Sequence, residues 1–141
     1  MTAGQVDVTI QSSESGSRLR FSNRRVEDNG PDFAMSADVA LDISGMHAQK
    51  TVYFWRNESI IQLFEQMAEN WRGWKGEKTA GSIEEDLTLR CTSDSLGHGF
   101  LRVVLVDYDD NWKAEGTLRV EGGQYETIAK QLKRFLSREQ S

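Results

Sequence analysis

The 141-residue sequence has one cysteine, one proline and no long hydrophobic run. Cys91 has no second cysteine with which to form an internal disulfide, which is typical of proteins from a reducing compartment. No apolar stretch approaches the roughly 20 residues that a membrane-spanning helix needs. The first residues, MTAGQVDVTIQ, have neither the basic nor the apolar segment of a signal peptide. These absences predict a cytoplasmic protein.

Positive charge is also in short supply. The chain has 17 Lys and Arg residues against 22 Asp and Glu, which gives a net charge of −5. We therefore expect no general attraction to nucleic acid or to an anionic membrane surface. An acidic surface instead suits a protein partner that is itself basic. The length is that of one domain, so we expect residues 1–141 to form a single unit.

Signatures of catalysis and metal binding are missing as well. The sequence has no G-x-S-x-G elbow, no P-loop and no G-x-G-x-x-G motif. His47 and His98 are the only histidines, and neither has the ligand spacing of HExxH or CxxC motifs. We interpret both as solvated turn histidines and Cys91 as a small buried thiol. We therefore predict a protein that is not an enzyme and that has no cofactor and no bound metal.

The central feature is a helix predicted within residues 57–78. Its apolar residues recur at helical spacing and form one stripe. Asn57 is suited to cap the start of the helix, and Gly73 is suited to end it. The stripe consists of Ile60, Ile61, Leu63, Phe64, Met67, Ala68 and Trp71.

Alternation of apolar and polar residues predicts strands on both sides of this helix, because side chains of a strand alternate between its two faces. The predicted strands are residues 5–12, 18–26, 33–43, 50–55, 83–93, 99–108 and 112–120. The glycine-rich residues 73–81 are interpreted as a connection. A second amphipathic helix follows Gly122 and Gly123, with a stripe of Tyr125, Ile128, Ala129, Leu132, Phe135 and Leu136.

The element order is therefore ββββ-α-βββ-α. This order predicts an α+β fold in which two amphipathic helices pack on a mainly antiparallel sheet. The pattern leaves open whether the sheet curls strongly, as far as a partial barrel. The two halves also align, with Phe64 opposite Leu132 and Met67 opposite Phe135. An internal repeat is a hypothesis that requires the two helices to occupy equivalent positions.

Two acidic segments are the first candidate binding residues. They are Glu84, Glu85 and Asp86 in one segment, and Asp107, Asp109 and Asp110 in the other. The second segment resembles the start of a calcium-binding loop, but Trp112 stands where that loop needs glycine and Leu118 where it needs glutamate. We interpret this segment as an acidic hairpin turn. Both segments are candidates for a surface that binds a basic protein.

Trp74 is the remaining candidate binding residue. It lies in the motif WRGWKGEK, which interleaves aromatic and cationic residues as some nucleic-acid and peptide grooves do. The alternative is that Trp74 covers the edge of the core while the cations stay in water. Trp71 is assigned to the helix stripe.

Three stretches carry a family resemblance: FEQMAENWRGWKGEKT, EEDLTLRCTSDSLGHGFLRVVL and, after Trp112, GGQYETIAKQLKRFL. They resemble a family of small uncharacterised proteins found mainly in actinobacteria. More distantly, the chain resembles the WapI-like immunity proteins of bacterial contact and polymorphic toxin systems. The resemblance implies a non-enzymatic binding protein with an α+β fold. It also implies an immunity role, in which the protein neutralises a partner toxin. The family has no assigned catalytic residues to carry over.

Two functions remain as alternatives. The first is a binding protein whose acidic residues attract a basic partner such as a toxin domain. The second is a small-molecule-binding domain or enzyme that uses a pocket between sheet and helices, with His47 or His98 contributing.

Overall fold

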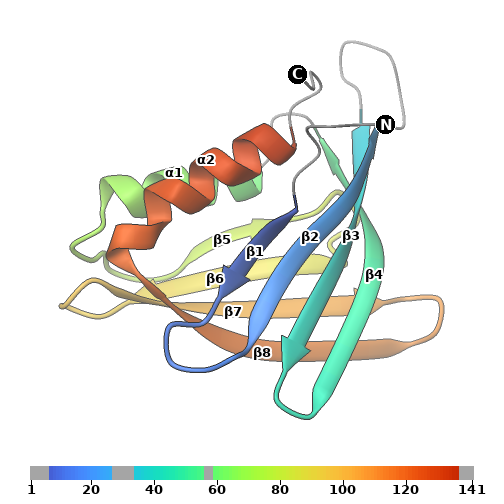
Figure 1. The fold of residues 1–141 in the computed structure, drawn as a ribbon, viewed down its shortest axis with the longest axis horizontal. Helices are drawn as coiled ribbons and strands as arrows, with labels where there is room; N and C mark the ends of the chain where they lie inside the picture. Colours follow the sequence, from blue (N-terminus) through green and yellow to red (C-terminus); the bar gives the residue numbers. More distant parts are fainter. Residues whose placement is uncertain (1–6, 27–33, 56–58, 137–141) are drawn as a thin grey trace.

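The computed structural model describes residues 7–26, 34–55 and 59–136, and shows two antiparallel four-stranded sheets with two helices (Figure 1). The first sheet contains β1 (Val8–Gln11), β2 (Arg18–Val26), β3 (Ala34–Ile43) and β4 (Met46–Trp55). The second sheet contains β5 (Lys78–Gly81), β6 (Leu87–Ser93), β7 (His98–Asp107) and β8 (Trp112–Glu121). The helices are α1 (Ser59–Glu69) and α2 (Tyr125–Phe135), the latter entered through the 3-10 helix η1 (Gly122–Gln124). The predicted α+β class is confirmed.

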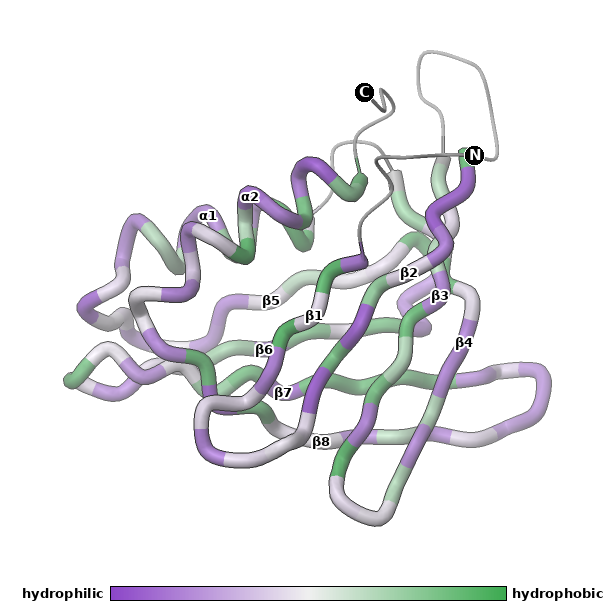
Figure 2. The backbone as a smooth tube through the Cα atoms, viewed as in Figure 1, coloured by the Kyte–Doolittle hydropathy of each residue, from purple (hydrophilic) through white to green (hydrophobic). Residues whose placement is uncertain are grey.

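The strands follow the alternation in the sequence. In β3, Met35, Ala37, Val39 and Leu41 are fully buried, whereas Asp38 and Ala40 on the other face are only partly buried. Figure 2 shows this alternation as changes of colour along the strands. Strands β3 and β4 form an antiparallel hairpin, and β7 lies inside its sheet between β6 and β8. Residue 33, predicted as a strand residue, lies outside the described residues.

Strand β5 was not predicted, and the sheet is divided in two. The four residues of β5 pair with β6, from Lys78 opposite Cys91 to Gly81 opposite Thr88. Only Ala80 of this strand is buried, so the segment has no apolar alternation that could have marked it as a strand. Within the described residues each sheet keeps its own four strands in the order β1-β2-β3-β4 or β5-β6-β7-β8, and the sheets are not closed into a barrel.

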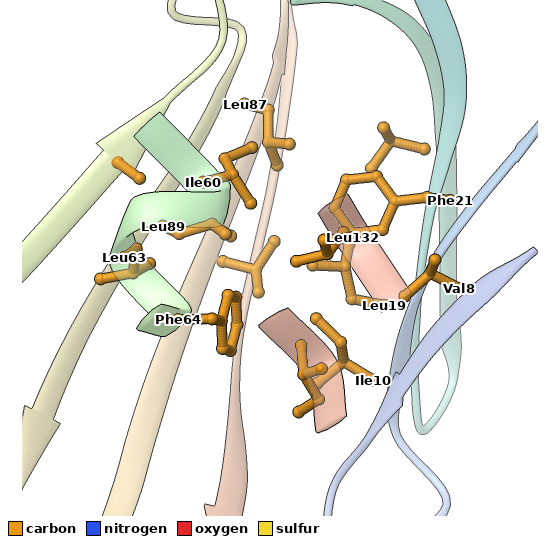
Figure 3. Packing of buried hydrophobic residues seen from close by; sticks show 14 of the residues in the cluster. Val8, Ile10, Leu19, Phe21, Ile60, Leu63, Phe64, Leu87, Leu89 and Leu132 are labelled. Carbon is orange, nitrogen blue, oxygen red and sulfur yellow. The ribbon is translucent and has the colours of Figure 1, made fainter. Parts of the chain in front are cut away.

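The helices cover the space between the two sheets. They lie side by side, with α1 in contact with β5 and α2 in contact with β1 (Figure 1). Their apolar stripes enter one core that both sheets share, as Figure 3 shows for Phe64 of α1 and Leu132 of α2. The predicted stripe of α2 is buried from Tyr125 to Leu136. In the described part of the chain, neither helix is long and apolar enough to cross a membrane.

The end of the first helix differs from the prediction. Helix α1 ends at Glu69, so Trp71 lies beyond it and is 51% exposed. Its assignment to the buried stripe is therefore wrong, since the helix stops before the turn that could direct it to the core. Asn57, the predicted cap of this helix, lies outside the described residues.

The two halves of the chain repeat one topology. Each half is a four-stranded meander followed by a helix. Equivalent backbone hydrogen bonds also join each half to the other. The N–H of Ser13, after β1, donates to the carbonyl of Arg119 in β8 (2.8 Å), and the N–H of Ile83, after β5, donates to the carbonyl of Tyr53 in β4 (3.0 Å). Because each helix contacts the first strand of the other half, the helices occupy the equivalent positions that the repeat hypothesis requires.

Candidate functional site

The structure brings the two acidic segments together. The turn between β5 and β6 carries Glu84, Glu85 and Asp86, and the turn between β7 and β8 begins at Tyr108. The N–H of Val106 donates to the carbonyl of Asp86 (2.8 Å), and the hydroxyl of Tyr108 donates to the carbonyl of Glu85 (3.3 Å). Pairing of β6 with β7 therefore makes one surface from segments that lie more than 20 residues apart in the sequence.

Five exposed residues form what we call the acidic surface: Glu84, Glu85, Tyr108, Asp109 and Asp110. Tyr108 is 65% exposed and comes from the same turn as the two aspartates. Tyr108 was not predicted as a binding residue, because the sequence pattern assigned residue 108 to the end of a strand. The surface thus combines four carboxylates with one exposed aromatic ring.

Asp86 and Asp107 lie behind this surface and share a cation. The Lys50 Nζ atom of β4 lies 3.7 Å from Oδ2 of each carboxylate. Asp86 is only 4% exposed and also accepts a hydrogen bond from the Ser82 hydroxyl (2.6 Å). Asp86 was predicted as a binding residue of its acidic segment, but the structure buries it behind the exposed carboxylates. We call Lys50, Asp86 and Asp107 the ion triad.

The turn after β7 is organised by Asp107. Its Oδ1 atom accepts hydrogen bonds from the backbone N–H groups of Asp109 (2.9 Å) and Asp110 (2.8 Å). The bond from Asp110, followed by the charge of Lys50, lowers the pKa of Asp107 below its usual value. Glu85 and Asn111 both have a φ of +58°, a conformation that non-glycine residues adopt at a cost. The acidic surface is therefore built on turns with a fixed backbone.

The other half of the chain fills the equivalent position with apolar contact. In the strand pairing, Lys50 lies opposite Val39 and Gly116 lies opposite Val103, so Gly116 of β8 corresponds to Lys50 of β4. By the same register, Ile43 corresponds to Asp107. The Ile43 side chain occupies the space beside Gly116, where an added Cβ atom would lie 2.6 Å from its Cδ1. The contact between the two sheets at this position can therefore be made by apolar groups, without charged residues.

Trp74 lies away from the acidic surface. Its Nε1–H donates to the carbonyl of Cys91 (3.3 Å), and its ring meets the edge of Tyr125 with centroids 6.1 Å apart. The side chain is half-buried against the core, with the Lys78 Nζ atom 5.5 Å from the ring centroid. Of the two alternatives for Trp74, these contacts favour the edge of the core.

Cys91 is buried as predicted, and burial raises the pKa of its thiol from the ordinary 9.0 to about 12. The thiolate is the reactive form, so the raised pKa keeps the reactive fraction of Cys91 very small at pH 8. We expect Ellman's reagent at pH 8 to label the native protein very slowly and the urea-unfolded protein rapidly. Absorbance of the released thiolate measures both rates. Rapid labelling of the native protein would contradict the burial of Cys91.

His98 is not the solvated residue that was predicted. Its Nδ1 atom lies 2.8 Å from Asp94 Oδ2, and its Nε2 atom lies 3.4 Å from Glu121 Oε1. His47 is exposed and contacts Asp42. Among the residues that the structure describes, no group of three or more His, Cys, Asp or Glu side chains is placed to hold a metal ion.

Two grooves bear on the small-molecule alternative. One, of about 740 Å³, lies between the β1–β2 and β3–β4 turns and is lined by residues that include Arg18, Asp42 and His47. The other, of about 510 Å³, lies between α1 and α2. Neither of these two grooves lies between a sheet and the helices, where that alternative places its pocket. The small-molecule alternative is therefore supported only by the groove beside His47.

The fold and site define an α+β protein of two antiparallel sheets and two helices, with a preformed acidic surface at the junction of the sheets. The chain belongs to the family of unknown function DUF6228, whose model matches residues 10–139. Membership of a family of unknown function is the part of the sequence resemblance that this match confirms. Comparisons with curated proteins and with solved structures gave no match.

Proposed function

We propose that this protein is a non-enzymatic binding protein of the immunity type, which neutralises a basic toxin domain by holding it on the acidic surface. The observation that carries the proposal is the meeting of Glu84 and Glu85 with Asp109 and Asp110 around the exposed ring of Tyr108. The cytoplasm is the proposed location, which is consistent with the single, buried cysteine.

Charge supports a basic partner. Four carboxylates on one surface of a protein with a net charge of −5 attract a cationic protein and raise its association rate. Tyr108 adds a large, stiff contact of the kind that often dominates binding energy at the centre of an interface.

Preorganisation supports a binding surface at this position. The turn backbone is fixed by Asp107 and by left-handed residues, so little conformational entropy is lost when a partner binds. The ion triad behind the surface is not a requirement of the fold, because Ile43 and Gly116 complete the equivalent junction without it. A binding function at this end of the molecule explains why this half of the chain has the ion triad instead of an apolar contact.

The immunity role rests on the distant resemblance to WapI-like proteins. It makes the partner a toxin domain, and a toxin gene beside the gene for this protein is the natural source of that partner. Co-purification from the native cell supplies the partner if no such gene is present.

The test compares two charge reversals of equal size. We expect Asp109→Lys/Asp110→Lys to slow association with the captured partner by about tenfold or more, because both side chains are exposed on the acidic surface. The matched control, Glu65→Lys/Glu69→Lys, changes the net charge equally but lies on α1. Surface plasmon resonance at two salt concentrations measures both rates. Equal slowing by the two variants would assign the effect to net charge and remove the acidic surface from the proposal.

A further inference from the structure

A second surface lies at the opposite end of the β7–β8 hairpin. Trp71 is 51% exposed and Leu96 is 78% exposed, although both are large apolar residues. Trp71 follows α1, and Leu96 lies in the turn between β6 and β7. Strand β7 runs ten residues from this turn to the acidic surface, so the two surfaces are about 30 Å apart.

The backbones of the two turns are in close contact. A Cβ atom at Gly97 would lie 2.7 Å from the carbonyl oxygen of Trp71, and one at Gly73 would lie 2.9 Å from that of Asp94. Both glycines have positive φ values, of +84° and +134°, which side-chain-bearing residues rarely adopt. Glycine at these positions therefore lets the segments carrying Trp71 and Leu96 meet.

The turn that presents Leu96 is held by its own hydrogen bonds. Oδ1 of Asp94 accepts bonds from the backbone N–H groups of Leu96 (2.8 Å) and His98 (3.0 Å), and Oδ2 lies 2.8 Å from the His98 ring. These bonds to the charged form lower the pKa of Asp94 and keep its carboxylate ionised. Figure 2 shows the apolar tip of this turn projecting beyond the sheet. The fixed turn thus presents a leucine to solvent.

The rim of this surface carries both signs of charge. The Arg72 guanidinium lies 5.0 Å from the centroid of the Trp71 ring, and Lys75 and Glu77 are exposed in the same connection. A two-fold interface joins the same patch on both copies, so its rim must complement itself. The two cations and one anion of the connection after Trp71 meet that condition, whereas a surface of one sign repels its own copy.

We propose that two copies of the chain associate through the surface formed by Trp71, Arg72, Lys75, Glu77 and Leu96, about a two-fold axis. Trp71 and Leu96 are the apolar anchors at its centre, and tryptophan and arginine are the residue types that most often dominate interfaces. The acidic surfaces lie at the far ends of this dimer and stay free. A dimer therefore presents two acidic surfaces, which strengthens binding to any partner that has two matching sites.

Sedimentation velocity of the full chain, in a dilution series through the micromolar range, tests this proposal. We expect the mass to rise with concentration from 16.0 kDa towards twice that value. Leu96→Asp and Trp71→Ser are each expected to weaken association by about tenfold or more. Tyr53→Thr, which removes an exposed aromatic residue from β4, is the matched control and should leave association unchanged.

A mass of 16.0 kDa at every concentration would overturn the proposal, as would unchanged association of both anchor variants. Thermal melting of each variant checks its fold, and Leu96→Asp should melt like the wild type because that side chain is largely exposed.

Discussion

Replacing Phe21 by alanine is expected to lower the free energy of unfolding by about 3–5 kcal/mol. Phe21 of β2 is fully buried, and its ring lies between two other aromatic rings. The centroid distances are 6.3 Å to Phe54 of β4 and 6.4 Å to Phe135 of α2. Alanine therefore leaves a cavity where the first sheet meets the second helix, and it also removes both ring contacts.

Urea unfolding followed by circular dichroism measures this loss. The whole stability of a domain is about 5–15 kcal/mol, so the variant is expected to be close to unfolding at 37 °C. Arg20→Ala is the matched control, because Arg20 precedes Phe21 in the same strand but is exposed and pairs with Asp7 at the surface. A surface ion pair contributes about 1 kcal/mol or less. Similar losses in the two variants would show that Phe21 is not packed as described.

Lys50→Met is expected to destabilise the protein by about 1–3 kcal/mol, because it leaves the Asp86 carboxylate without its cation. Asp86 is only 4% exposed, so bulk water replaces the lost partner poorly. Methionine keeps most of the length and volume of lysine, which limits the loss of packing.

A double-mutant cycle isolates the charge effect. Asp86→Asn keeps an oxygen that can accept the Ser82 hydroxyl bond but removes the negative charge. The double variant Lys50→Met/Asp86→Asn is expected to be more stable than Lys50→Met alone, because no unpaired charge is then buried. Urea unfolding of the four proteins gives the coupling energy. A coupling energy near zero would mean that Lys50 and Asp86 act independently.

Periodicity predicted most of the secondary structure correctly. Of the eight strands in the residues that the structure describes, seven were predicted, as were both helices there. Each of these places apolar residues on one face at a period of two or of 3.6 residues. Strand β5 has one buried residue, Ala80, and thus no period to detect. Trp71 was misplaced because its spacing continued the helix stripe, and spacing alone does not show that the helix ends at Glu69.

The candidate site was predicted in composition but not in arrangement. The acidic residues of both turns were identified because runs of Asp and Glu between strands are typical of exposed turns. Their meeting depends on the pairing of β6 with β7, and the buried place of Asp86 depends on Lys50, which comes from the other sheet. Tyr108 and Leu96 could not be separated from core residues by type, since exposure of an apolar side chain depends on what packs over it.

The sequence by itself determined the local structure of this protein: the period of each strand and helix, the acidic balance and the residue types in each turn. Only the tertiary structure decided which of those turns meet, because contacts between distant segments depend on how the strands pair and how the two sheets pack. The period of a strand or helix is a local property, because it follows from the backbone geometry of a few consecutive residues. The acidic surface around Tyr108 and the apolar surface at Trp71 and Leu96 follow instead from packing, to which the whole chain contributes.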